Sequence, residues 1–234
     1  MNPDELKDLI EGLNNKLNSD NRNELNAKLN NLQNAFPFNF YEFNLMYLLD
    51  KGAITFDYYE NLRAEYVTAN KHLELFSLAP RIFGEIWGQN HLMELDERFE
   101  KPSTGLDPGY EGQYDLWFEG IKVEVKASRS INTKVRGNLV SKALRFDDNQ
   151  PFWMNYQQLK LDIADVFIFI GVWVDEIKYW VMSNDEIKNS PHMSHQHRGG
   201  IEYQIGITHR NISDFDEYLV LPDELGNTIL AKTN

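Results

Sequence analysis

Three charged residues near the middle of the chain have side-chain types and a spacing that suit binding of a divalent cation. Asp115 precedes a possible tight turn at residues 119–120, and Glu124 and Lys126 follow it. A two-residue loop there would place Asp115 opposite Glu124, with Cβ atoms roughly 4.5–5.5 Å apart. Lys126 lies two residues beyond Glu124, so the two side chains share one face of a strand. Local geometry alone therefore gathers all three charges on one side of a hairpin.

The segment 114–126 predicts two short antiparallel strands. Gly120 suits a turn position that needs positive φ, and a two-residue loop pairs Phe118 with Ile121. The other face of this hairpin carries apolar residues suited to a core, namely Leu116, Val123 and Val125.

Opposed carboxylates destabilise a hairpin unless something offsets their repulsion. A cation held between Asp115 and Glu124 would do so, and oxygen ligands suit Mg²⁺. Lys126 could then position a water molecule or stabilise developing negative charge. The alternative is a surface hairpin with ordinary charged residues on its solvated face, where Asp, Glu and Lys are common.

Asp115 followed by Glu124-Val125-Lys126 on an apolar strand resembles the core motif of the PD-(D/E)XK nucleases. The resemblance implies an α/β, restriction-endonuclease-like fold with a mixed sheet flanked by helices, here preceded by an N-terminal helical region. It also implies that Asp115 and Glu124 bind Mg²⁺ and that Lys126 assists the attacking water. The chain departs from the motif in having Tyr114 where the family motif has Pro, although members of that family often lack this Pro.

The same resemblance suggests a further acidic residue on the helix before the core. Glu85 is the matching candidate for this catalytic role, although it lies among apolar residues of a helix expected to begin at Pro80. The alternative is a solvent-facing Glu85 that pairs with Arg81 one turn earlier.

Apolar periodicity and turn residues predict the remaining elements. We expect an N-terminal helical segment over 1–36 and a catalytic domain over 37–234. Within them the pattern predicts two short helices before residue 36, helices at 38–49, 57–76, from 80, and 151–164, a loop at 100–113, strands at 165–174, 177–182 and 201–208, and an edge strand or short helix at 214–221. Ser183 to Glu186 resembles a capping box. The family resemblance allows Gln157 or Gln158, on the helix expected at 151–164, to lie near the active site.

The charge distribution gives a possible nucleic-acid surface within an acidic protein. The net charge is −13, yet residues 122–145 carry seven Lys or Arg against one Glu, so the remainder carries −19. Phosphate binding usually leaves such a basic footprint. The candidate DNA-binding residues are Ser128, Arg129, Lys134, Arg136, Lys142 and Arg145. A solvated surface excursion is the alternative.

Several protein classes are disfavoured by composition. The chain has no Cys, so a disulfide framework or a thiolate metal site is excluded. The N-terminus lacks the features of a signal peptide, and no apolar run is long enough for a membrane span, so we expect a cytoplasmic protein without membrane contact.

His192, His195 and His197 could form a zinc site, a DNA-contacting loop or a polar surface loop.

Together these observations predict an endonuclease that uses Mg²⁺ to hydrolyse double-stranded DNA. The family resemblance implies a type II restriction enzyme that acts as a homodimer on palindromic sites. A repair or recombination nuclease that cuts by DNA structure is the first alternative. A non-catalytic acidic binding protein is the second, and the net charge of −13 is consistent with it.

Overall fold

The computed structural model describes residues 3–30, 37–197 and 200–233, and it divides into two compact units. The first unit is Met1–Ser77 together with Arg136–Ala143, and the second is Leu78–Val135 together with Leu144–Asn234. The first long segment of unit 1 ends at Ser77, whereas the sequence predicts a domain boundary after residue 36. A short excursion from the second unit, residues 136–143, belongs to the helical first unit.

The first unit is helical. Its elements are α1 (Pro3–Asn14), α2 (Ser19–Asn30), α3 (Pro37–Asp50), α4 (Phe56–Ala69) and the short 3₁₀ segments η1 (Leu73–Phe76) and η3 (Val140–Lys142). Leu13 of α1, Leu17 of the connection that follows it and Leu25 of α2 are buried. The helix expected at 57–76 instead ends at Ala69 and resumes as a 3₁₀ turn. Residues 31–36 of the expected N-terminal segment lie outside the described residues.

The second unit begins with a continuous helical stretch of two kinds. A π-helical segment, η2 (Ile82–Trp87), runs directly into α5 (Gly88–Leu95), and the Gly88 amide donates to the Phe83 carbonyl five residues earlier. Such π segments alter the direction in which the following side chains project, and they occur frequently at functional sites. The other helical elements of this unit are α6 (Asn184–Lys188), η4 (Ile212–Tyr218), η5 (Pro222–Glu224) and α7 (Leu225–Thr233).

A six-stranded mixed sheet forms the centre of the second unit. Its strands, in spatial order, are β1 (Phe99–Glu100), β2 (Leu116–Phe118), β3 (Ile121–Arg129), β5 (Val166–Val172), β6 (Ile177–Ser183) and β9 (Leu219–Val220). The β3–β5 pair is parallel and the other pairs are antiparallel. Every residue of β5 is buried, as its continuous apolar sequence predicts. The capping box from Ser183 to Glu186 is confirmed.

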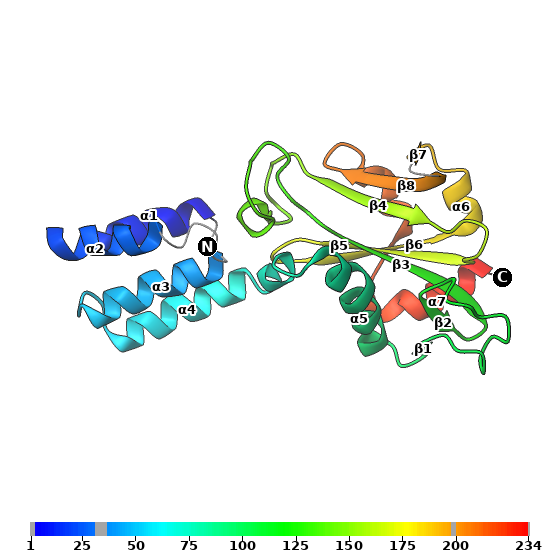
Figure 1. The fold of residues 1–234 in the computed structure, drawn as a ribbon, viewed down its shortest axis with the longest axis horizontal. Helices are drawn as coiled ribbons and strands as arrows, with labels where there is room; N and C mark the ends of the chain where they lie inside the picture. Colours follow the sequence, from blue (N-terminus) through cyan, green and yellow to red (C-terminus); the bar gives the residue numbers. More distant parts are fainter. Residues whose placement is uncertain (1–2, 31–36, 198–199, 234) are drawn as a thin grey trace. The chain divides into compact units, whose positions relative to one another are not determined.

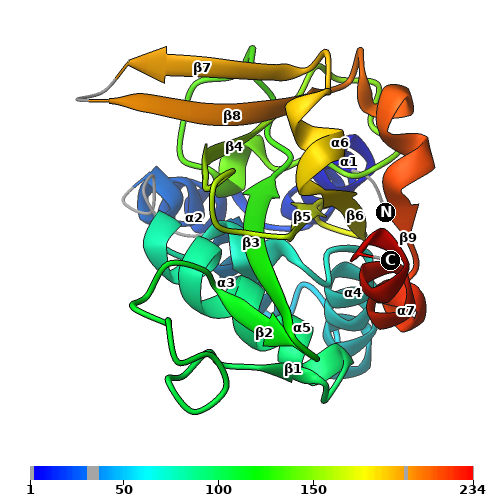
Figure 2. The same cartoon turned by 90° about the vertical axis from the view of Figure 1, so that its right-hand side faces the viewer.

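A second, three-stranded sheet lies over one face of the first. Its order is β4 (Trp153–Leu159), β8 (Ile201–Thr208) and β7 (Met193–His197), all antiparallel, and Figure 2 shows β7 and β8 side by side. The helix predicted at 151–164 is therefore wrong. Met154 and Tyr156 are buried, whereas Trp153 is exposed and Asn155 is half-buried, which is strand periodicity. An apolar spacing of four satisfies both periods, so the sequence pattern did not distinguish them.

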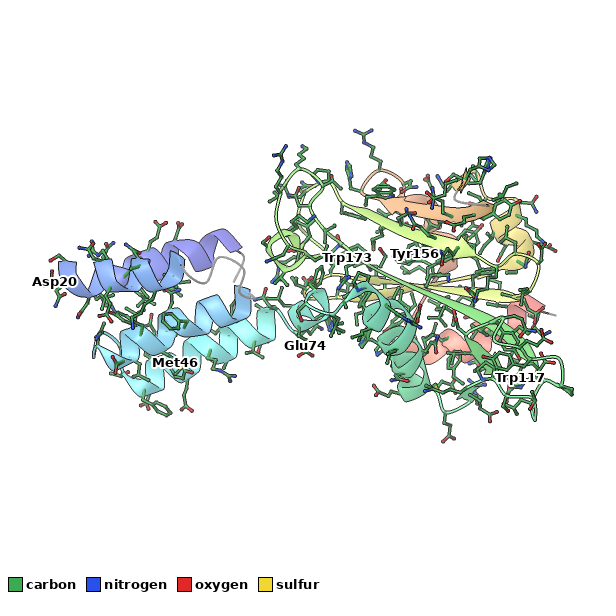
Figure 3. The ribbon with its side chains drawn as sticks, in the orientation of Figure 1. Asp20, Met46, Glu74, Trp117, Tyr156 and Trp173 are labelled. Carbon is green, nitrogen blue, oxygen red and sulfur yellow. The ribbon has the colours of Figure 1, made fainter. Side chains whose placement is uncertain are left out.

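The core of the second unit lies between these two sheets. Figure 1 shows β4 and β8 on one side of β3, β5 and β6, with α5 on the other side. Phe167 and Phe169 of β5 pack with Tyr156 and with Ile205 of β8 in one apolar cluster. The side chains of Tyr156 and Trp173, labelled in Figure 3, belong to this cluster.

Candidate active site

The β2–β3 hairpin has the geometry that the sequence predicts. Glu119 and Gly120 form its turn with φ angles of 47° and 99°, and Phe118 pairs with Ile121. Positive φ at both central residues gives a turn whose twist matches that of the flanking strands. The last paired residues are Leu116 and Val123. The next residues outward along the two strands are Asp115 and Glu124.

Asp115 is fixed at the point where β2 leaves β3. Its amide donates to the Val123 carbonyl at 3.1 Å. Its carboxylate Oδ2 accepts a hydrogen bond from the Val125 amide at 2.9 Å. Oδ1 accepts from Gln89 Nε2 at 3.3 Å, from the start of α5. Two donors from different elements therefore orient this carboxylate.

Glu124 is a fully buried carboxylate between two lysines. Its side chain is 0% exposed, with Lys126 Nζ 2.7 Å from Oε1 and Lys160 Nζ 3.3 Å from Oε2. Both ammonium groups lie at ion-pair distance, and Lys126 also acts on the Glu124 carboxyl as a hydrogen-bond donor. The contact with Lys160 is the longer of the two.

The electrostatics of Glu124 reflect its burial. Desolvation raises the pKa of the Glu124 carboxyl above its ordinary value, and the nearby charge of Asp115 raises it further, whereas Lys126 and Lys160 oppose this shift. Because one buried carboxylate feels the charge of a second, an additional positive charge at this point would favour ionisation of both. A divalent cation would supply that charge.

The faces of the sheet separate the charged site from the helix that supports it. In the parallel ladder Glu124 pairs with Phe167 and Lys126 with Phe169, so both charges face the second sheet. On the opposite face, a Cβ built on Gly88 would lie 3.5 Å from Ala127 Cβ. That distance is an ordinary contact, and the packing of α5 on β3 at this point brings Gln89 within reach of Asp115.

Lys160 reaches the site through an irregularity in the second sheet. The pairing of β4 with β8 shifts between Gln157 and Leu159, and Gln158 has a φ of 58°, which is rare for a residue other than Gly. Such bulges redirect the chain, and Lys160 follows this one. Local sequence patterns do not reveal this contact of Lys160, because it depends on strand β4, where those patterns predict a helix.

The structure places Glu85 away from the buried charges. Its side chain is 61% exposed, and its Oε2 accepts from Arg81 Nε at 2.8 Å, which is the alternative that the sequence left open. Gln89, four residues later, makes the contact with Asp115. A role of Glu85 at a metal site stays a prediction.

The six candidate DNA-binding residues have different environments. Arg129 is only 9% exposed, donates to the Leu78 carbonyl at 2.8 Å and lies over the Phe83 ring. Arg145 lies 3.4 Å from Asp147 and 3.3 Å from Asp175. Of the others, Lys134 is exposed and Ser128 half-buried, while Arg136 and Lys142 belong to the first unit.

The histidines His192, His195 and His197 lie in different surroundings. His192 Nε2 lies 3.1 Å from Asp214 and its ring packs on Phe215, whereas His195 and His197 lie on β7. Within the described residues, no group of three or more His, Cys, Asp or Glu side chains is arranged to hold a metal ion.

Mg²⁺ does not require such a group, because it commonly binds through one or two carboxylates and keeps several water molecules or phosphate oxygens. Asp115 and Glu124 provide two carboxylates that interact electrostatically. The Glu124 carboxylate is fully buried, and a cation would supply positive charge that opposes the cost of that burial. The arrangement is chemically suited to hold a divalent cation beside the ammonium group of Lys126.

Comparison with known proteins identifies no relative of the chain: no protein-family model, curated protein or solved structure matches it. Among the described residues, no helix is both long and apolar enough to cross a membrane.

Proposed function

We propose that this protein is a Mg²⁺-dependent DNA endonuclease of the PD-(D/E)XK type. The observation that supports this most strongly is the environment of Glu124. A fully buried carboxylate lies at ion-pair distance from both Lys126 and Lys160 and within electrostatic reach of Asp115. A cation there would offset the repulsion between the two carboxylates.

In this proposal Asp115 and Glu124 hold the cation. When bound, Mg²⁺ lowers the pKa of a water molecule and stabilises charge on the scissile phosphate. The Val125 amide and Gln89 keep the Asp115 carboxylate in a fixed orientation. Lys126, held at Glu124 on the same strand face, orients the attacking water or stabilises negative charge that develops on the phosphate.

The substrate we propose is double-stranded DNA. Exposed Lys134 and half-buried Ser128 follow the site along the chain and are candidates for phosphate contacts, which position a protein without reading sequence. We further propose sequence-specific restriction by a homodimer, on the basis of the family resemblance alone. Sedimentation analysis of the purified protein tests the dimer.

The first experiment is incubation of the full-length protein with unmethylated phage DNA and Mg²⁺. We expect cleavage by the wild type, and a loss of about 10²- to 10³-fold in Asp115→Asn, Glu124→Gln and Lys126→Ala, because each removes a group that we propose to act at the reaction centre. Glu176→Gln is the matched control, since Glu176 is a partly exposed carboxylate paired with a lysine at 2.9 Å. Glu85→Gln, assayed in parallel, decides whether Glu85 contributes.

The form of the products separates the candidate activities. Discrete fragments would support a restriction enzyme, and a smear would favour a nuclease that cuts by DNA structure. Cleavage that persists in Glu124→Gln would contradict the proposed site. Absence of both cleavage and Mg²⁺ binding in the wild type would favour a non-catalytic binding protein.

A further inference from the structure

Lys160 directly follows strand β4 of the second sheet, and it contacts Glu124 of the central sheet. It follows the bulge at Gln158 and lies 3.3 Å from Glu124 Oε2, with 36% of its side chain exposed. Lys126 lies closer to the other oxygen, at 2.7 Å, and is 20% exposed. Glu124 is therefore held by a closely bound lysine from its own strand and by a more distant, more exposed lysine from another element.

The two lysines occupy both sides of a carboxylate that is also the candidate cation ligand. A divalent cation at Glu124 would lie beside both ammonium groups, and like charges at such distances repel strongly in a partly desolvated site. Binding of the cation therefore requires at least one lysine to withdraw. Lys160 has the longer contact and the greater exposure, and its side chain can turn to solvent with the smaller loss of burial.

We propose that Lys160 is a displaceable counter-ion of Glu124 that competes with the divalent cation for Oε2. In the cation-free protein Lys160 helps to neutralise a buried carboxylate, which would be costly to leave unpaired. It thereby lowers the affinity of the site for the cation. This inference rests on the proposed function for the identity of the cation site. It adds that the Lys160 side chain regulates binding of the cation to that site.

The chain offers a closely matched control. Lys122 lies on β3, as does Glu124, and it contacts Asp107 at 3.3 Å with 36% of its side chain exposed. Its ion-pair distance and exposure equal those of Lys160, but its partner is a different carboxylate. Replacing either lysine with Met keeps most of the apolar stem and removes only the charge.

The test is calorimetric titration of MgCl₂ into the full-length protein without nucleic acid, so that the readout does not depend on cleavage. We expect Lys160→Met to bind Mg²⁺ about 3- to 10-fold more tightly than the wild type, a coupling within the usual range between interacting sites. Lys160→Arg and Lys122→Met should bind like the wild type. Asp115→Asn should lose the binding, which assigns the measured heat to this site.

Thermal unfolding in EDTA provides the second readout. Lys160→Met should unfold at a lower temperature than the wild type because Glu124 loses a counter-ion, and added Mg²⁺ should raise its melting temperature by more than it raises that of the wild type. Lys160→Gln is the second variant if the Met variant does not fold.

The outcomes separate this inference from the proposed function. Equal or weaker Mg²⁺ binding by Lys160→Met, with binding by the wild type, would overturn the competition and leave the nuclease proposal standing. Binding by the variant alone would support competition, since the lysine then blocks the site. No binding by any protein would overturn both.

Discussion

At the scale of single residues, the site depends on how Asp115 is oriented as much as on its charge. The carboxylate completes the hydrogen bonding of β3 at Val125 and also accepts from Gln89. Both contacts leave lone pairs that point elsewhere, since each carboxylate oxygen can accept about two hydrogen bonds. Groups that orient ligands in this way often matter almost as much as the ligands themselves.

We predict that Gln89→Ala lowers Mg²⁺ affinity and DNA cleavage by about 10- to 100-fold, the usual effect of removing a group that orients a metal ligand. Asn90→Ala, at the next position of α5, is the control and should change neither. Calorimetric titration and initial cleavage rates provide the measurements. A Gln89→Ala protein with wild-type affinity would show that the 3.3 Å contact to Asp115 has no positioning role.

At the scale of elements, two glycines lie at packing contacts on opposite faces of the central sheet, and they differ in the space available for a side chain. A Cβ on Gly88 would meet Ala127 and Val125 at 3.5 and 3.6 Å, which is ordinary contact. A Cβ on Gly171 would lie 2.7 Å from the Trp180 ring, and that distance requires the ring to move. Trp180 is fully buried in the core between the sheets, so it has little space in which to move.

We therefore predict that Gly171→Ala destabilises the protein by about 1–3 kcal/mol through overpacking. Gly88→Ala should be neutral or stabilising by up to about 1 kcal/mol, because Ala is the better helix former. Urea unfolding followed by tryptophan fluorescence measures both free energies. Equal stability of the two variants would argue against the tight packing of Trp180 on β5.

At the scale of the whole molecule, the basic stretch that the sequence singles out is divided between the two units. Arg136 and Lys142 belong to the first unit, and the second unit holds the others. Burial lowers the pKa of Arg129 to about 10, so its guanidinium still carries a charge at neutral pH, but its contacts are the Leu78 carbonyl and the Phe83 ring. Exposed Lys134 differs from it in having access to solvent.

This difference predicts separate consequences for DNA binding, measured by fluorescence anisotropy in the cleavage-deficient Asp115→Asn background. Lys134→Ala should weaken binding and reduce the slope of log K against log salt by about 1, the effect of one lost phosphate contact. Arg129→Met should instead lower the melting temperature and leave that slope unchanged. An unchanged slope in Lys134→Ala would remove this residue from the phosphate-binding surface.

The sequence by itself determined those features whose causes are local. The turn at 119–120 and alternation along β3 specify the positions of Asp115, Glu124 and Lys126 within one hairpin, because neighbouring strand residues have a fixed geometry. The buried strand β5 and the capping box at Ser183 are equally local in origin. The mixed α/β class follows from the same patterns.

Only the tertiary structure decided which residues from distant segments complete the site. Lys160 reaches Glu124 because β4 pairs with β8 and bulges at Gln158, and Gln89 rather than Glu85 reaches Asp115 because α5 packs closely at Gly88. The segment 151–164 carried an apolar spacing compatible with a helix, and pairing with β8 gave it strand structure. These outcomes depend on contacts between residues far apart in the chain, which local periodicity does not encode.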